Sequence, residues 1–186
     1  MAAQDHTPLS FRGFASFLKT PVLLGGVLAA CCFSSCTTAK VPKGVQLAKN
    51  FDPLRFEGTW YELARSNHPD QAGLTRVSAT YKRNPDGSWL VTDRAWSNAE
   101  GIWLGSERKG KNGASQASFK LKHAKPRHIV IIDPEHTMAL VCSNTYRQFW
   151  IISKNPEPEP TRFDRMISAA QEAGFPVKEA IALPTR

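Results

Sequence analysis

The feature that most constrains the fold of this chain is a succession of eight short β-rich runs separated by turn-forming residues. The connecting segments are rich in Asn, Asp, Gly and Pro, which supply the backbone angles of tight turns. Short strands at spacings of about ten residues are typical of an all-β sandwich or barrel. Because an even number of meandering antiparallel strands can close and leave no free edge, we expect an eight-stranded antiparallel up-and-down β-barrel. The expected strands are residues 59–66, 74–83, 88–96, 102–108, 115–123, 127–133, 137–143 and 147–153.

A C-terminal α-helix is expected after the last strand. Residues 155–160 contain three prolines, which cannot donate to a strand ladder, so the sheet ends there. Thr161, with Asp164 three residues later, is expected to cap the helix, and Gly174 to end it. The helix has one apolar face, which we expect to pack against the outside of the barrel. That face comprises Phe163, Met166, Ile167 and Ala170.

The N-terminal residues predict an export signal. Arg12 and Lys19 precede an uncharged apolar run, residues 21–30, which as a helix would span only about 15 Å of a ~30 Å hydrocarbon core. A basic flank, a short apolar run and small residues at its end are typical of a secretory signal. The end of the run, Leu28-Ala29-Ala30-Cys31, resembles the lipobox of bacterial lipoproteins. This resemblance implies that Cys31 is lipidated as the first residue of the mature chain.

Alternatives remain open at this end of the chain. Cys36 is a second candidate for lipidation, with Phe33 where an aliphatic residue is usual, and an ordinary signal peptide would leave a soluble periplasmic protein. A metal site at the clustered cysteines would need a His or a second Cys pair, which the segment lacks. Lipoproteins with Asp after the lipidated Cys stay in the inner membrane; Cys32 stands there, so the resemblance implies the outer membrane. We expect a signal peptide over 1–30, a lipidated N-terminus and tether over 31–46, and a barrel with its C-terminal helix over 47–186.

Residues 50–62 resemble the opening motif of the lipocalin family, in which Gly-x-Trp follows a short helical turn. Asp52 is suited to cap that turn, which Pro53 begins, and Gly58 lets the chain bend into the first strand. Trp60 is then expected to close the bottom of the barrel. The resemblance therefore implies a structural role at the barrel base for Gly58 and Trp60.

Two further motifs support the resemblance. Residues 131–141 resemble the second motif of the family, with His136 where Tyr is usual, and residues 149–154 resemble the third, which normally ends in an Arg stacked on the motif Trp. Lys154 replaces that Arg at the barrel base. Because an ammonium group has no planar face, its cation–π contact with Trp60 is expected to be weaker. The three motifs together are most similar to those of bacterial outer-membrane lipocalins.

The resemblance implies what such a barrel does. Lipocalins bind a small hydrophobic molecule, and the bacterial outer-membrane branch binds a lysophospholipid or a fatty acid, with no cofactor and no chemistry of its own. The protein would store or transport this lipid in maintenance of the envelope under stress, anchored to the membrane through its own lipid. The apolar wall would hold the acyl chain with the polar head near the mouth. We expect a monomer or a weak homodimer.

Strand alternation predicts which side chains point into the barrel, because successive residues of a strand face opposite sides. The pattern is set by placing Trp60 inward, and it leaves the register of residues 102–108 open. Each apolar member of the inward set either contacts the ligand or fills the core. The expected ligand-binding residues are Trp60, Glu62, Ala64, Val77, Ala79, Tyr81, Trp89, Val91, Asp93, Phe119, Leu121, Ile129, Ile131, Trp150 and Ile152, with Gly58, Trp60 and Lys154 at the base.

Charged side chains in this set need an explanation of their own. A carboxylate that faces inward costs several kcal/mol unless it is paired or hydrated. Either Glu62 and Asp93 help to orient a polar lipid head, or Glu62 pairs with a neighbouring Arg as part of the fold. Residues 108–111 form a basic run that we expect in a hairpin loop, either solvated or attracted to anionic lipid headgroups.

Composition and motifs narrow the remaining function classes. The 24 Lys and Arg against 16 Asp and Glu give a net charge of +8, which favours anionic partners, but the export signal argues against nucleic acid. No Ser-His-Asp arrangement, phosphate-binding loop or His-Glu-x-x-His motif is present. The alternative function is a lipocalin-like enzyme acting on a hydrophobic substrate, which would use a cavity Cys or paired acids. Cys142 is expected to face outward as a small buried hydrophobe, so we expect no catalytic residue, no cofactor and no metal.

Overall fold

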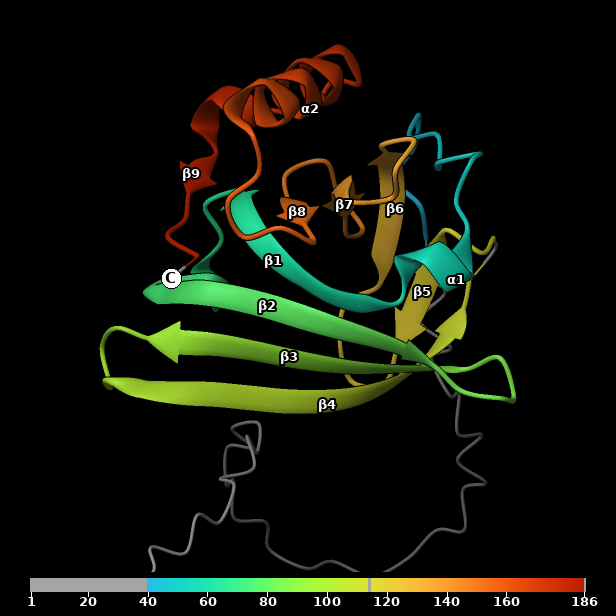
Figure 1. Ribbon diagram of the computed structural model, residues 1–186, viewed down its shortest axis with the longest axis horizontal. Coiled ribbons are helices and arrows are strands. Elements are labelled where there is room, and N and C mark those ends of the chain that lie inside the picture. Colours follow the sequence, from blue (N-terminus) through green and yellow to red (C-terminus); the bar gives the residue numbers. More distant parts are fainter. Residues whose placement is uncertain (1–39, 114, 186) are drawn as a thin grey trace, which may run out of the picture. The chain divides into compact units, whose positions relative to one another are not determined.

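The computed structural model describes residues 40–113 and 115–185, which form a closed antiparallel β-barrel (Figure 1). The expected signal peptide, Cys31 and Cys36 lie outside the described residues. Each strand pairs with the next along the chain, and β1 pairs with both β2 and β8, which closes the sheet. The expected eight-stranded up-and-down barrel is therefore confirmed. Its strands are β1 (Gly58–Arg65), β2 (Leu74–Arg83), β3 (Trp89–Ser97), β4 (Ile102–Asn112), β5 (Ser118–Leu121), β6 (Arg127–Ile132), β7 (Met138–Cys142) and β8 (Phe149–Ser153).

Strand β4 is longer than its sequence predicts. It continues to Asn112, pairing first with β3 and then, from Gly110 onward, with β5. The prediction that residues 108–111 form a hairpin loop is therefore wrong. Residues 107–111 are all charged except Gly110 and show no apolar alternation, so the sequence alone gives no sign that the strand continues.

A short ninth strand, β9 (Ile181–Ala182), was not predicted and lies at a seam of the barrel. It pairs with the end of β1, beyond the point where β1 and β2 separate. The amide of Leu183 donates to the carbonyl oxygen of Leu63 in β1 at 2.9 Å, and the amide of Arg76 in β2 donates to the carbonyl oxygen of Pro184 at 3.1 Å. The segment thus bridges the two strands where their own ladder ends.

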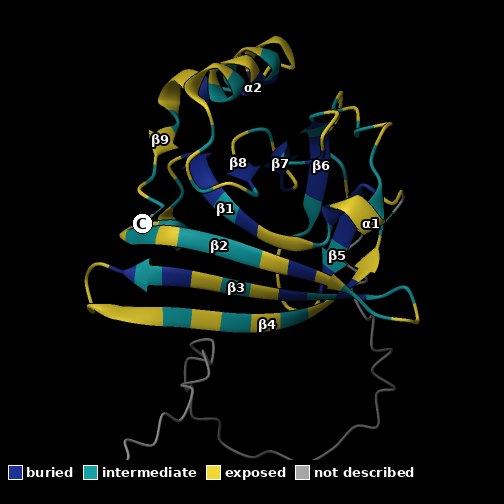
Figure 2. Cartoon of the chain, viewed as in Figure 1, coloured by how far each residue is buried: buried dark blue, intermediate teal, exposed yellow. Residues whose placement is uncertain are grey.

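Apolar side chains form two clusters, one inside the barrel and one between the sheet and helix α2 (Pro160–Glu172). Because strand residues alternate in direction, a single strand contributes to both. Strands β6 to β8 are therefore buried on both faces, whereas β2 is mostly half-buried and β4 is mostly exposed (Figure 2). The expected packing of the helix outside the barrel is confirmed. The outer cluster includes Met138, Leu140, Cys142, Met166 and Ala170.

Helix α2 begins two residues earlier than predicted. Pro160 is its first residue and Glu159 holds the N-cap position without a side-chain hydrogen bond, so the expected cap at Thr161 is not formed. Proline suits the first turn of a helix because its fixed φ is helical and its missing N–H needs no partner there. Gly174 follows the end of the helix with a φ of +85°, as expected of a glycine that ends a helix. No helix in the described residues is long and apolar enough to cross a membrane.

One end of the barrel is closed by the short helix α1 (Pro53–Phe56). The Asp52 carboxylate caps it by accepting the amide of Leu54 at 2.9 Å, as expected from the motif. Gly58 then adopts a φ of +110°, which a residue with a side chain rarely tolerates, and starts β1. The Trp60 indole Nε1 donates to the carbonyl oxygen of Phe56 at 2.8 Å, so the ring is fixed beneath the barrel.

Packed aromatic rings fill this end, and Lys154 covers them. The Lys154 Nζ lies 5.3 Å from the Trp60 ring centroid and donates to the carbonyl oxygens of Arg55 at 2.7 Å and Glu57 at 2.9 Å. We call the packed rings the aromatic floor; neighbouring centroids in it are 4.6 to 5.9 Å apart. The opposite end, which carries the β1–β2, β3–β4, β5–β6 and β7–β8 loops, is the mouth. The aromatic floor comprises Phe51, Phe56, Trp60, Trp89 and Phe119.

Candidate functional site

Most of the residues expected to face inward lie in the inner cluster. Their positions follow from the predicted alternation, since cross-strand partners such as Tyr81 and Val91 share a face. Val77 is half-buried and belongs to neither cluster. The inner cluster contains Trp60, Tyr81, Trp89, Val91, Phe119, Leu121, Ile129 and Ile152, with Ala79 and Trp150 packed against it.

Two of the expected inward residues face the other way. The pairing of β1 with β8 shifts register between Glu62 and Ala64, and the pairing of β6 with β7 shifts between Ile129 and Ile131. A β-bulge adds one residue to a strand and so reverses the alternation beyond it. Ala64 and Ile131 consequently lie with the outer cluster, and placing them inside the barrel was wrong.

Strand β4 adds an inward arginine that sequence reasoning placed in a loop. Val91 of β3 is paired with Arg108, and Asp93 with Ser106. Directly paired residues of an antiparallel ladder point to the same face, so Arg108 points into the barrel. Lys109 and Lys111, on either side of Gly110, are exposed.

Asp93 lies between two arginines inside the barrel. One carboxylate oxygen accepts from Arg108 Nη1, and the other accepts from Arg127 Nη2 at 2.6 Å. Arg127 Nη1 also donates to the Tyr81 hydroxyl at 2.7 Å. Strands β3 and β6 are not neighbours in the sheet, so the bond between Asp93 and Arg127 crosses the barrel interior. We call Arg108 and Arg127 the arginine pair.

Solvent reaches this network. The side chains of Asp93, Arg108 and Arg127 are 22%, 31% and 21% exposed, although they point into a closed barrel. The rings of Trp60, Trp89 and the rest of the aromatic floor below are, by contrast, buried or half-buried against one another. Side chains at the level of Asp93 are therefore accessible, whereas those of the aromatic floor are largely not.

Glu62 forms a separate pair near the mouth. Its carboxylate accepts from Arg65 Nη1 at 2.9 Å, and both side chains are almost fully buried. Arg65 also donates to the carbonyl oxygens of Gln71 at 2.7 Å and Leu74 at 2.9 Å, which ties the β1–β2 loop to the barrel. Burial raises the pKa of Glu62, although the hydrogen bond and charge of Arg65 act to lower it. Of the two roles considered for Glu62, this geometry fits pairing with a neighbouring arginine.

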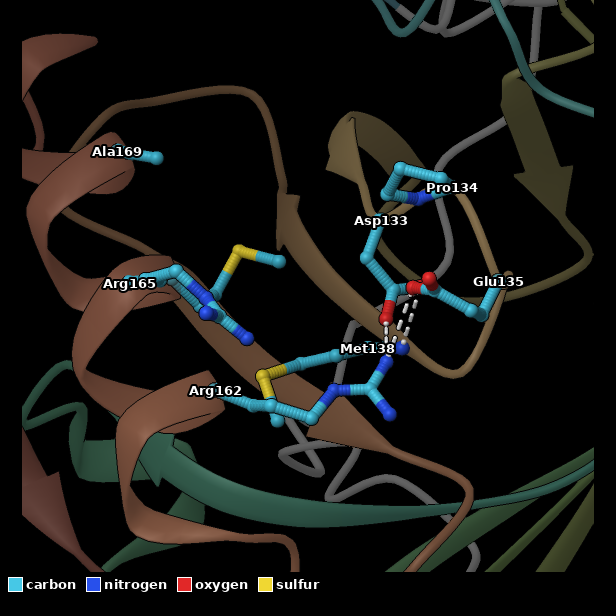
Figure 3. Close-up of a pocket in the computed structure, with 8 residues that line it drawn as sticks. Asp133, Pro134, Glu135, Met138, Arg162, Arg165 and Ala169 are labelled. Carbon is cyan, nitrogen blue, oxygen red and sulfur yellow. Dashed lines mark hydrogen bonds and ion pairs between the residues drawn. The ribbon is translucent and has the colours of Figure 1, made fainter.

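A surface hollow of about 430 Å³ lies outside the barrel, between α2 and the β6–β7 turn (Figure 3). At its edge, Arg162 Nη2 donates to Asp133 at 2.5 Å and to Glu135 at 3.1 Å. Asp133 also accepts the amides of Thr137 at 2.7 Å and Met138 at 3.0 Å. These bonds fasten the helix to the turn, so the hollow is a feature of that junction. Its lining residues are Asp133, Pro134, Glu135, Met138, Arg162, Arg165, Met166 and Ala169.

Neither a metal nor a nucleophile site is apparent in the part of the chain that the structure describes. No group of three or more His, Cys, Asp or Glu side chains there is arranged to hold a metal ion. Cys142 is buried in the outer cluster on the face of β7 that points away from the interior, as expected. Burial raises the pKa of its thiol to about 12. A buried, protonated thiol outside the barrel is not suited to act on a ligand inside it.

Comparison of the sequence with known proteins gives consistent matches. A family model described as a lipocalin-like domain matches residues 51–185. The chain is 32% identical over 165 residues to the outer membrane lipoprotein Blc of Escherichia coli (strain K12), covering 86% of this chain and 93% of that protein. It is 28% identical over 156 residues to temperature-induced lipocalin-1 of Arabidopsis thaliana, covering 76% and 83%.

Solved structures match the fold. The major allergen Per a 4 from cockroaches superposes with a TM-score of 0.64 at 18% identity, covering 78% of this chain and 94% of that chain. Insecticyanin from the tobacco hornworm Manduca sexta gives a TM-score of 0.64 at 16% identity, covering 78% and 86%. At these identities the likeness concerns the arrangement of the strands alone.

Proposed function

This chain belongs to the lipocalin family, and we propose that its barrel binds a lysophospholipid or a fatty acid. The observation that carries the proposal is the exposure of inward-facing side chains. Asp93, Arg108 and Arg127 point into a closed barrel and remain partly accessible, and access from the mouth is part of the proposal. Ligand sites of this kind combine an apolar wall with a few polar groups that fix orientation.

Different residues would close the base of such a site and line its wall. The aromatic floor closes the bottom, where Gly58, Trp60 and Lys154 hold the base. Above the floor, Ala79 and Ile152 offer small and aliphatic surface, and the half-buried Trp150 offers a ring whose Nε1 donates to Gln71 Oε1 at 2.8 Å. We assign ligand contact to the inward residues above the floor and exclude Ala64 and Ile131, which face outward.

The proposed location is the outer membrane. Relatives similar over most of their length are named outer membrane lipoprotein, and the Leu28-Ala29-Ala30-Cys31 sequence supports an acyl anchor at Cys31. Each buried methylene of an anchor contributes about 0.8 kcal/mol, so several acyl chains would hold the protein at the membrane almost irreversibly. The carried lipid would then be stored or moved in maintenance of the envelope.

Native mass spectrometry of the protein offered a mixture of lipids tests the binding function. Retention of one lysophospholipid or fatty acid per chain, unchanged in mass, is the expected result. A chain that stays empty across the mixture would contradict the proposal, and a ligand released with an altered mass would indicate an enzyme. Incorporation of labelled palmitate tests the anchor: it should be lost in Cys31→Ser and retained in Cys36→Ser.

A further inference from the structure

Above the aromatic floor, the inward side chains in the ion pairs of the described residues carry one more positive charge than negative. Glu62 is neutralised by Arg65, and Asp93 by one member of the arginine pair. The second member of the pair has no carboxylate of its own within the described residues. An unbalanced charge in a partly buried site favours a ligand that supplies the opposite charge.

The arginine pair also has N–H donors that are not used by the described residues. Arg127 gives one Nη to Asp93 and the other to the Tyr81 hydroxyl. Arg108 gives a single Nη to Asp93, and no acceptor among the described residues takes its remaining N–H groups. A guanidinium group is suited to bind a carboxylate or a phosphate through two parallel bonds. Arg108 is therefore placed to bind an oxyanion that comes down the barrel.

The depth of the arginine pair fixes which way a lipid would lie. Tyr81, which Arg127 contacts, packs its ring on Phe56 at 4.9 Å and on Phe119 at 6.0 Å between centroids, so the pair sits on the aromatic floor. The packed floor leaves no path below it. One step nearer the mouth, the inward pair Ala95 and Leu104 is apolar.

Resting on the proposed function, we infer that the barrel takes single-chain lipids with a monoanionic head, which lies on the arginine pair while the acyl chain extends towards the mouth. This orientation is opposite to the expectation from sequence, which placed the head at the mouth. A single excess positive charge matches the one negative charge of a fatty-acid carboxylate or of a phosphodiester. A neutral head would leave that charge unbalanced, and a cationic head would add to it.

Three ligands with the same chain length and different head groups separate the contribution of the head group to the affinity from that of the acyl chain. We would titrate dodecanoate, dodecanol and dodecyltrimethylammonium into the full-length chain carrying Cys31→Ser and Cys36→Ser, which prevents lipidation. Dodecanoate should bind about tenfold to a hundredfold more tightly than dodecanol, as expected for hydrogen bonds to a charged group. Equal binding of all three would overturn the head-group inference and leave the proposed function standing. If none bound, the proposed function itself would fail.

Substitutions test whether the arginine pair causes the difference in affinity between dodecanoate and dodecanol. Arg108→Gln removes one ion pair and should bring the affinity for dodecanoate close to that for dodecanol, with dodecanol itself unaffected. Arg165→Gln, an exposed arginine on α2, is the matched control and should change neither. Loss of both ligands in Arg108→Gln would indicate damage to the barrel, which the thermal melting temperature of the variant checks. Unchanged selectivity in a folded Arg108→Gln would refute the assignment.

Spin-labelled fatty acids report the orientation. A nitroxide close to the carboxylate should broaden the amide resonance of Tyr81, and a nitroxide at the methyl end should broaden that of Leu104, nearer the mouth. The reverse pattern would place the head at the mouth and overturn the inferred direction. Lysophosphatidylglycerol and lysophosphatidylcholine then distinguish the source of the head: selective binding of the first extends the inference to phosphodiesters, and equal binding of both would contradict it.

Discussion

Replacing Asp133 by Ala should lower the free energy of unfolding by about 3–5 kcal/mol. The side chain is 14% exposed, and its carboxylate accepts two backbone amides, the Thr137 hydroxyl and the Arg162 guanidinium. A neutral hydrogen bond contributes about 0.5–1.5 kcal/mol net, and one to a charged group about 1.5–3 kcal/mol. Arg162 keeps Glu135 and Thr137 as partners after the substitution, which places the total below the simple sum.

Denaturant unfolding of the two chains measures this difference directly, with an unchanged slope against denaturant concentration as the sign that only stability has altered. In a chain of this size each kcal/mol lowers the melting temperature by about 2–4 °C, so a drop of about 10 °C should accompany it. Glu135→Ala is the matched control, because this carboxylate contacts the same guanidinium but is 63% exposed; it should cost less than about 1 kcal/mol. Equal effects of the two substitutions would refute the reasoning.

The same carboxylate predicts a pH dependence. Burial acts to raise the pKa of Asp133, but hydrogen bonds from Met138, Thr137 and Arg162 together lower it below its ordinary value of 3.8. A group whose pKa is lower in the folded state than in the unfolded chain stabilises the fold above the unfolded pKa, and this contribution is lost as the pH falls through the folded value. The stability difference between wild type and Asp133→Ala should therefore be constant near neutral pH and shrink in acid.

Two further predictions concern buried groups. Arg65→Met leaves the Glu62 carboxylate buried without its partner, so it should lower the free energy of unfolding by about 3–5 kcal/mol. Adding Glu62→Leu to the same chain should recover much of that loss. Denaturant unfolding of the two single variants and the double variant measures both effects, and additive losses would contradict the pairing. Burial raises the pKa of Cys142 to about 12, so this thiol should resist iodoacetamide at pH 8 in the folded chain and react after unfolding. Peptide mapping of the alkylated residue measures this difference. Rapid labelling of Cys142 in the folded protein would contradict the prediction.

The barrel could be predicted from sequence because its signals are local and repeat along the chain. Turn residues mark where each strand ends, and the alternation of apolar residues places Trp60, Tyr81, Val91 and Phe119 on one face. Bulges cannot be predicted in this way, since the register shift beside Ala64 depends on how β8 pairs with β1 and not on the residues of β1 alone. The seam strand β9 could not be predicted for the same reason.

The arginine pair was missed for two different reasons. Arg127 shares the face of Ile129 by simple alternation, so its inward direction was available from the sequence and was hidden by the expectation that charges lie outside. Arg108 needed the register of β3 against β4, which only the paired strands define. The inward charge of Asp93 was the available clue, because a buried carboxylate requires basic partners nearby.

The seam strand β9 also bears on when the barrel can form. Beyond their own ladder, β1 and β2 are joined only through residues 181–184, which follow the first strand by most of the length of the barrel domain. Pairings between such distant segments form slowly, because a long loop must be ordered before any contact is gained. A growing chain that has exposed all eight barrel strands still lacks the segment that completes the seam. The mouth ends of β1 and β2 can therefore be joined only once the C-terminal segment is available.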